Sequence, residues 1–362
     1  MLYRITLIAI ILFYTRVGYG VDLSGASAVI FGDSVASGAA THPALEYNGD
    51  VLWDILSGKV DVSAKSSDIP QIGGLELERP QIVFLSESEI ANHPFDSTTI
   101  LLTQSLSSIF LNTEEYSWGY QIARKFGAPG SKIYFASTNG AQSADFLKQV
   151  QRFLTVSGGQ LPKYIFVMFT GNDLCSLYGT GMTSAEVYSS NIEAGLSLLT
   201  EMTPHPEGTN IVLAGILPVT QVYQSASILD YKVKAYGNEV TCRELRETKF
   251  LRPESVQPKY AATAMFSQLF PPNPSLMCPS LFAVDKVMKD QISEVATTAG
   301  LYRDGLEKLA ATYRKKSNGF SVRYLKSLSN MKLEGSDIAQ DCFHLSIDGQ
   351  SKVAERLIAE LK

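Results

Sequence analysis

Residues 28–38 read AVIFGDSVASG. The four apolar residues at the start of this stretch show no polar alternation, which is typical of a parallel strand that is covered on both faces. A glycine, an aspartate and a serine follow directly, where such a strand would end. Ligands of open parallel sheets bind outside the carboxyl ends of the strands, so Ser34 stands where a substrate would be bound.

Four more apolar runs alternate with helical patterns along the chain, and together they predict the fold. We expect strands at 132–136, 163–169, 210–216 and 319–325. We expect helices at 118–126, 141–154, 184–202, 282–315 (with a break near Gly300) and 347–362. This alternation predicts a doubly wound α/β fold with a five-stranded parallel sheet between helices. For five strands we expect the flavodoxin-like order 2-1-3-4-5.

Two long connections interrupt the alternation, at about 41–115 and 221–279. Glycines mark turns in the first connection, and prolines such as Pro253 and Pro258 break any regular element in the second. Connections of this length are usually lids or packed subdomains. Because no fixed-period repeat or low-complexity linker divides the chain, we expect one catalytic domain over 21–362 with these two insertions.

The first twenty residues follow a different pattern. Arg4 precedes the apolar run 5–14, and small residues follow up to Gly20. A run of this length is too short for the roughly 20 residues that cross a bilayer. We therefore predict a signal peptide over 1–20, cleaved near Gly20, and a secreted or periplasmic product. An uncleaved anchor is the alternative.

Composition excludes several classes of protein. The 362 residues include 31 Lys plus Arg and 36 Asp plus Glu, which leaves a formal net charge of -5. The chain has no dense run of Lys and Arg, so a nucleic-acid partner is not expected. Hydrophobic residues at 45% and charged residues at 19% match globular usage and exclude disordered or collagen-like chains.

Polar residues also follow the second and third predicted strands. Gly140 comes after the second strand and Asn172 after the third, while Asp341 and His344 stand just before the last helix. Strands one, two and three are neighbours in the expected order, so Ser34, Gly140 and Asn172 should converge at one edge of the sheet. This convergence indicates a site formed from distant parts of the chain.

These residues provide the groups that acyl transfer needs. A serine hydroxyl is a weak nucleophile that requires a base, which His344 can provide while Asp341 holds the imidazole in the right tautomer. The backbone N–H groups of Ser34 and Gly140 and the side-chain amide of Asn172 could form an oxyanion hole. A glycine at position 140 keeps the backbone open to the reacting group. The alternative is that Asp341 and His344 merely cap the last helix.

In this order, the blocks around Ser34, Gly140, Asn172 and the pair Asp341 and His344 resemble the SGNH, or GDSL-type, hydrolases. These are esterases and lipases with a flavodoxin-like fold, and the resemblance covers the chain from about residue 28 to its end, without the two insertions. It implies that Ser34 is the nucleophile, His344 the base and Asp341 the orienting acid of a serine ester hydrolase without metal or cofactor. The motif Gly-x-Ser-x-Gly is absent, which disfavours the α/β-hydrolase fold.

Two motifs refine the resemblance. The strings GNDLC at 171–175 and DCFHLS at 341–346 look like those of lipid-acting members, similar to phospholipase B and acyloxyacyl hydrolases. They imply a lipid acyl ester as the substrate and transient contact with a membrane surface. Carbohydrate O-acetyl esterases share the same blocks and are the alternative. An alternative of another class is a catalytically vestigial module that binds lipid or glycan.

The chain contains four cysteines, and export would place them where disulfides persist. None forms a Cys-x-x-Cys pair, so a zinc site is not indicated. Three connectivities are open to four cysteines. Because Cys175 is close in sequence to Asn172 and Cys342 to His344, we predict that these two cysteines bridge, which leaves Cys242 and Cys278 for a second bond. The alternative is that Cys175 and Cys342 are buried free thiols.

Overall fold

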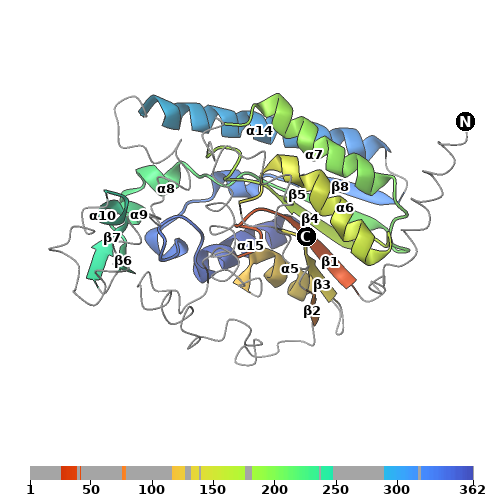
Figure 1. The fold of residues 1–362 in the computed structure, drawn as a ribbon, viewed down its shortest axis with the longest axis horizontal. Helices are drawn as coiled ribbons and strands as arrows, with labels where there is room; N and C mark the ends of the chain where they lie inside the picture. Colours follow the sequence, from red (N-terminus) through yellow and green to blue (C-terminus); the bar gives the residue numbers. More distant parts are fainter. Residues whose placement is uncertain are drawn as a thin grey trace, which may run out of the picture.

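A parallel sheet forms the centre of the structure, a computed structural model (Figure 1). The residues that it describes are 26–38, 41, 76–78, 116–126, 132–137, 140–175, 182–235, 238–247, 289–316 and 319–361. In these ranges the sheet has six strands in the order β2-β3-β1-β4-β5-β8. The strands are β1 (Ala26–Gly32), β2 (Glu76–Glu78), β3 (Lys132–Phe135), β4 (Tyr164–Met168), β5 (Thr209–Ala214) and β8 (Phe320–Leu325).

This order confirms the predicted fold class. Taken in chain order, the five expected strands have the arrangement 2-1-3-4-5, and all their pairings are parallel. The short strand β2 is an addition. It comes from the first long connection and pairs with β3 at the edge of the sheet.

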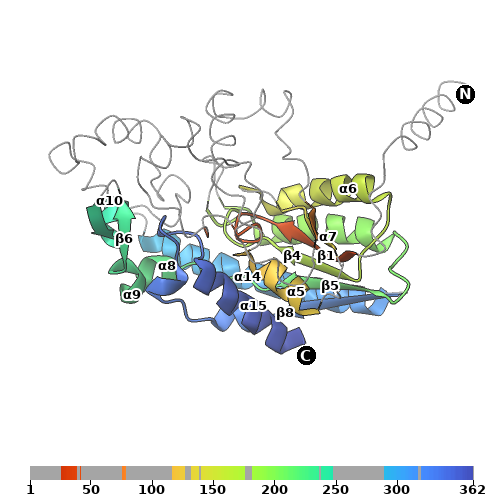
Figure 2. The same cartoon turned by 90° about the horizontal axis from the view of Figure 1, so that it is seen from below.

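Helices cover both faces of the sheet (Figures 1 and 2). One face packs against α6 (Phe146–Ser157), α7 (Ala185–Thr200) and α14 (Lys289–Lys316), and the other against α5 (Trp118–Phe126) and α15 (Ile347–Leu361). Successive side chains of a strand point to opposite faces, so β1 contributes to both cores. Val29 and Phe31 belong to the first core, and Ala28 and Ile30 to the second.

The long helix α14 differs from its prediction. It runs without a break from Lys289 to Lys316, so the expected break near Gly300 is wrong, and residues 282–288 lie outside the described part of the chain. One glycine in a helix interior costs about 1 kcal/mol. The buried side chains of Tyr302, Leu306 and Ala310 pack in the core beneath this helix and offset that cost.

Part of the second long connection forms a small unit beyond the carboxyl end of β5. It consists of α8 (Gln221–Gln224), α9 (Ala226–Leu229), the antiparallel hairpin of β6 (Lys232–Ala235) and β7 (Asn238–Thr241), and α10 (Cys242–Glu247). Figure 1 shows these elements in green at one end of the molecule. The predicted signal peptide, most of the first insertion and the remainder of the second lie outside the described residues. No helix within the described ranges is long and apolar enough to cross a membrane.

Candidate active site

Ser34 lies in a tight turn directly after β1. The Ser37 N–H donates to Asp33 O at 3.1 Å, and the Ser37 hydroxyl donates to Ser34 O at 3.0 Å. Ser34 itself is 7% exposed. The turn therefore holds the serine at the sheet edge where the sequence predicts the site.

Gly32, the last residue of β1, makes this sharp turn feasible. It has a φ of +149°, and a Cβ atom there would collide with Met168 O. The side chain of Gln149 bonds both backbone groups of Gly32, accepting from its N–H at 3.0 Å and donating to its carbonyl at 2.9 Å. The pairing of β1 with β3 ends at Ile30, so the buried amide of Gln149 bonds the backbone of Gly32 where β3 no longer pairs with it.

A second buried glutamine fixes the turn from the other face of the sheet. Gln350 on α15 donates to Val35 O at 3.2 Å and accepts from the Trp118 N–H at 3.0 Å. Neither Gln149 nor Gln350 is among the functional residues that the sequence predicts. Their sequence pattern could have indicated this role, because both glutamines stand on the apolar stripe of an amphipathic helix, where a buried polar side chain needs a hydrogen-bond partner.

Asp33 connects the serine turn to the loop after β4. One carboxylate oxygen accepts from the Val35 N–H at 2.9 Å, and the other accepts from Thr170 N at 2.9 Å and Gly171 N at 3.3 Å. Burial raises the pKa of Asp33, while these backbone hydrogen bonds and the nearby His344 act in the opposite direction. Asp33 therefore fixes two segments that both contribute to the predicted oxyanion hole.

Asn172 is hydrogen-bonded to Ala141, the residue that follows Gly140. The Asn172 side-chain amide donates to Ala141 O at 2.8 Å, and Gln142 Nε2 donates to Asn172 O at 3.2 Å. An amide nitrogen has two protons, so Asn172 retains one donor for a substrate. Gly140 has a φ of +77°, a left-handed conformation that glycine adopts readily. Among the described residues, none accepts a hydrogen bond from the backbone N–H of Ser34 or Gly140.

Asp173 joins the two loops that carry these donors. Its carboxylate accepts from the Ser143 N–H at 2.8 Å and from the Ser143 hydroxyl at 2.7 Å. Burial is the main cause that raises the pKa of Asp173 to about 6. Tyr302 donates to Asp173 O at 3.4 Å and stacks on Tyr188 with ring centroids 4.0 Å apart. Asp173 is thus a structural hydrogen-bonding group in this turn.

His344 and Asp341 form a buried pair on the loop before α15. His344 Nδ1 lies 2.5 Å from one Asp341 oxygen, and the other oxygen accepts from the backbone N–H groups of Phe343 at 3.0 Å and His344 at 2.9 Å. Burial acts to raise the pKa of Asp341, but the charge of His344 and these hydrogen bonds outweigh it, so the pKa is lowered. The Phe343 ring packs edge-on to the imidazole at 4.8 Å.

Three of the predicted residues, Ser34, Asn172 and His344, line one cavity of about 40 Å³. Its other walls are mainly apolar and include Leu217 and Val222. Asp341 lies behind His344, and Gly140 is outside the lining. Within the described residues no hydrogen bond joins the Ser34 hydroxyl to His344, although both line this cavity. In hydrolases such bonds often shorten only when the substrate binds. No cluster of three or more His, Cys, Asp or Glu in those residues could hold a metal ion.

The disulfide prediction is wrong. Cys342 bonds Cys242 across a Cα–Cα distance of 5.5 Å, not Cys175. Cys175 is also disulfide-bonded, so the alternative of free thiols is excluded, and Cys278 lies outside the described residues. The reason is spatial: the β6–β7 hairpin and α10 fold back over the histidine loop, which nearness in sequence to catalytic residues does not reveal.

Comparison with known proteins identifies the family. The family model described as GDSL-like lipase/acylhydrolase matches residues 96–357, which include Gly140, Asn172, Asp341 and His344 but begin after Ser34. No curated protein matches the sequence. A crystal structure of LAE5, an α/β hydrolase enzyme from the metagenome of Lake Arreo, Spain, is similar over 93% of this chain and 96% of that chain, with 12% identity and a TM-score of 0.38. This likeness is too weak to add to the assignment. Because the family model covers more than half of the chain, the protein belongs to the GDSL-like lipase/acylhydrolase family and is an ester-hydrolysing enzyme.

Proposed function

We propose that Ser34, His344 and Asp341 form the catalytic triad with which this enzyme hydrolyses carboxylic esters through an acyl-enzyme. The observation that carries the proposal is that His344, bonded to the buried Asp341, lines the same small cavity as Ser34. These groups come from opposite ends of the chain. Their juxtaposition at the carboxyl ends of the strands matches the parts that acyl transfer requires.

The reaction follows from this arrangement. Ser34 Oγ attacks the ester carbonyl carbon while His344 Nε2 accepts the hydroxyl proton, and Asp341 stabilises the imidazolium through Nδ1. The tetrahedral intermediate collapses, the bond to the alcohol breaks, and the alkoxide leaves with the proton from His344. A water molecule then attacks the acyl-enzyme carbonyl carbon while His344 accepts a proton from it. The bond between this carbon and Ser34 Oγ breaks, and His344 returns the proton to Oγ, which gives the acid and free Ser34.

The negative charge on the attacked carbonyl oxygen needs donors that are already in place. We assign this role to the backbone N–H groups of Ser34 and Gly140 and to Asn172 Nδ2. The hydrogen bonds of Asp33 and Asp173 hold the loops that carry them, so little reorganisation is needed during the reaction.

Lipid acyl esters are the substrates that we propose first. Apolar side chains line the cavity beside Ser34, and an acyl chain would gain about 0.8 kcal/mol for each CH₂ group that it buries there. The wall residues are Leu217, Val219, Val222, Leu333 and Leu345. The motifs at 171–175 and 341–346 also resemble those of phospholipase B and acyloxyacyl hydrolases. Such a substrate would bring the enzyme to a membrane surface.

The small size of the cavity favours a second candidate. A volume of about 40 Å³ exceeds the space that one water molecule needs by only a few-fold. It would accommodate an acetyl group without further opening. A carbohydrate O-acetyl esterase is therefore the second function that this site supports.

We also propose that the enzyme is exported, with residues 21–362 as the mature hydrolase domain. The apolar run 5–14 behind Arg4 supports cleavage near Gly20. Amino-terminal sequencing of the protein recovered outside the producing cells would test this. Recovery of the intact amino terminus in the cytoplasm would contradict it.

Hydrolysis of p-nitrophenyl esters from acetate to palmitate tests the function. We expect activity in the wild type and its loss in Ser34→Ala. Rates that rise with chain length would support a lipid esterase, and activity confined to acetate would support the O-acetyl esterase. Val222→Ala, which enlarges the cavity, should move the preferred ester towards longer chains. Equal activity of wild type and Ser34→Ala would disprove the proposed nucleophile.

A further inference from the structure

The loop that carries His344 and Asp341 is short and closed on itself. An isolated antiparallel bridge joins Ile338 to Leu345 at its base, and the Ala339 N–H donates to His344 O at 2.8 Å. Cys342, between the acid and the base, has a φ of +58° and is the one non-glycine residue with positive φ among the described residues. This conformation costs a residue with a side chain roughly 1–2 kcal/mol, so surrounding contacts must impose it.

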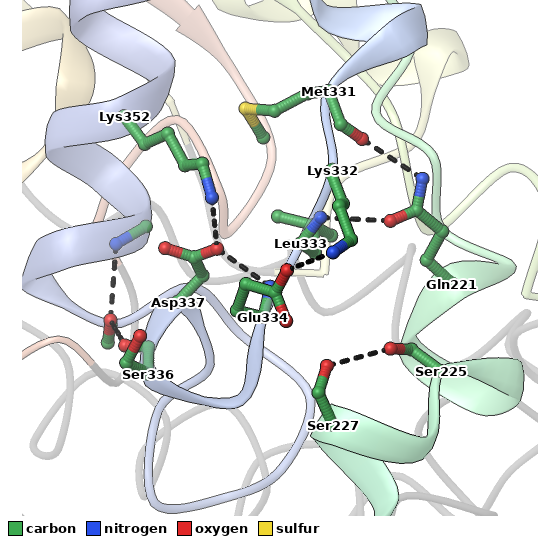
Figure 3. A network of polar contacts seen from close by, with 12 residues as sticks. Gln221, Ser225, Ser227, Met331, Lys332, Leu333, Glu334, Ser336, Asp337 and Lys352 are labelled. Atoms are coloured by element: carbon green, nitrogen blue, oxygen red, sulfur yellow. Dashed lines mark hydrogen bonds and ion pairs between the residues drawn. The ribbon is translucent and has the colours of Figure 1, made fainter.

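The base of the loop is fixed to the main domain. Lys352 on α15 forms an ion pair with Asp337 at 2.6 Å, and Asp337 accepts from the Glu334 N–H at 2.8 Å (Figure 3). The Ser346 hydroxyl donates to Ser336 O on the other side of the base. These contacts hold both ends of the loop. At its tip the Cys342 N–H donates to Ala339 O at 2.9 Å within the loop, and none of the contacts at the base reaches the Cys342 side chain.

The tip is held by the second insertion, through residues 221–235 and 238–247, which we call the clasp segment. Cys242, the first residue of α10, is bonded to Cys342, and both cysteines are fully buried. Next to this bond, the Lys234 N–H on β6 donates to Gln340 Oε1 at 3.0 Å. Within the described residues, a covalent bond and a hydrogen bond thus attach the hairpin unit to the loop beside Asp341.

The clasp segment is in turn anchored to the chain that leads into the loop. Gln221 donates to Met331 O at 3.0 Å and accepts from the Leu333 N–H at 2.9 Å, as Figure 3 shows. Gly335 packs so closely against Ser227 O and the Tyr231 ring that a Cβ atom would collide with them. The segment therefore bridges the chain before the catalytic loop and the tip of that loop.

We infer that the clasp segment is a positioning element of the catalytic site, in which the Cys242–Cys342 bond holds Cys342 in its left-handed conformation and thereby keeps Asp341 and His344 in register. This inference rests on the proposed triad. Without the bond, Cys342 can relax to an ordinary conformation, which turns the peptide planes on both sides and moves the flanking acid and base. Misplacement of catalytic groups by about 1 Å costs on the order of 100-fold in rate.

The test compares Cys242→Ala, Cys342→Ala and the double variant with the wild type. We expect each to lower kcat by roughly 10- to 100-fold with little change in KM. We also expect loss of the far-downfield proton signal of the Asp341–His344 hydrogen bond in NMR spectra. Leu309→Ala is the matched control, because it removes a core side chain on α14 and lowers stability without touching the loop. It should keep the wild-type kcat and NMR signal.

A second measurement keeps the test valid if the variants fail to fold. The wild type is incubated with increasing concentrations of a thiol until the buried Cys242–Cys342 bond opens, while circular dichroism confirms that the protein stays folded. The thiols that are released are alkylated, and a peptide map shows which bond has opened. Opening of Cys242–Cys342 should lower kcat in proportion, and reoxidation before alkylation should restore it. The inference is overturned if kcat and the NMR signal persist with this bond open. Activity that survives in Ser34→Ala would instead refute the proposed triad. A loss of kcat on opening the disulfide could then not be explained by displacement of Asp341 and His344.

Discussion

Asp341 holds His344 with both carboxylate oxygens. One oxygen lies 2.5 Å from the ring Nδ1, and the other accepts the backbone N–H of the same histidine at 2.9 Å. The two residues are three positions apart, so one tight turn fixes both the backbone and the ring of His344. This double contact orients Nε2 towards the cavity that Ser34 lines.

Replacement of Asp341 by asparagine should abolish most activity without unfolding the loop. The amide oxygen of Asp341→Asn can still accept from the backbone, but its NH₂ group would face Nδ1 and favour the tautomer in which Nε2 is protonated. That imidazole cannot accept the Ser34 proton. We expect kcat to fall roughly 10⁴-fold, as in other triads, with a small change in KM. Steady-state kinetics would check this, with the exposed Asp348→Asn as a control of wild-type activity. A loss below tenfold would remove Asp341 from the triad.

Asn172→Ala should reduce kcat by about 10²- to 10³-fold, because it removes a proposed oxyanion donor, which would act mainly in the transition state. KM should change little. Single-turnover measurements with a p-nitrophenyl ester would isolate acylation. Asn210→Ala, at the opposite end of the sheet where β5 begins, is the matched control and should be fully active. If Asn172→Ala raised KM and left kcat unchanged, the residue would bind substrate rather than stabilise the intermediate.

The sequence predicted the five main strands and their order because buried parallel strands appear as unbroken apolar runs. It also predicted that Ser34, Gly140 and Asn172 would converge, because the carboxyl ends of adjacent strands share one edge. In the structure Ser34 and Asn172 line one cavity together with His344, and Gly140 is outside its lining. These inferences depend only on local pattern and on the small set of α/β topologies.

The features that the sequence did not predict depend on contacts between distant segments. The partner of Cys342 is decided by how the β6–β7 hairpin folds back, and no local signal fixes that path. The sequence predicts a break near Gly300 in the helix over 282–315, but the packing of α14 against the sheet and α7 overrides the low helix propensity of glycine. The roles of Gln149 and Gln350 depend on backbone groups more than a hundred residues away.

Asp173 should make stability fall as the pH rises from about 4 to 6. Its pKa is 3.8 when unperturbed and about 6 in the fold, where burial is the main cause. The folded state thus binds the Asp173 proton more tightly than the unfolded state does. The stability that this proton contributes is fully present below pH 3.8, the unfolded pKa, and is lost as the pH rises through about 6, the folded pKa. The shift corresponds to on the order of 3 kcal/mol. In Asp173→Asn this part of the pH dependence should disappear.

Urea unfolding at several pH values between 4 and 7 would measure this. The exposed Asp230→Asn is the control, and its free energy of unfolding should follow pH as in the wild type. The expected result is a flatter dependence in Asp173→Asn alone. Parallel curves for all three proteins would show that Asp173 does not titrate in this range.

Gln350→Leu should lower both stability and kcat. It leaves the Trp118 N–H and the Val35 carbonyl without their hydrogen bonds in a buried region, and each unsatisfied group costs about 1–3 kcal/mol. Because Val35 follows Ser34, the proposed nucleophile, the serine turn should also be held less rigidly, which lowers kcat. Gln350→Glu keeps an acceptor for the Trp118 N–H but has no donor for the Val35 carbonyl. This variant therefore distinguishes the effect of the contact with Val35 from that of the contact with Trp118.

Denaturant unfolding and kinetics on the same preparations would check this prediction. Gln151→Leu, at an exposed position of α6, changes the same chemical groups without a buried partner and should match the wild type in both measurements. If the contact with Val35 positions the serine turn, Gln350→Glu should lose activity while retaining part of the stability that Gln350→Leu loses. Wild-type kcat in both variants would limit Gln350 to a role in packing, and the position of Ser34 would then depend on the other contacts of the turn, which include those of Gln149, Asp33 and Ser37.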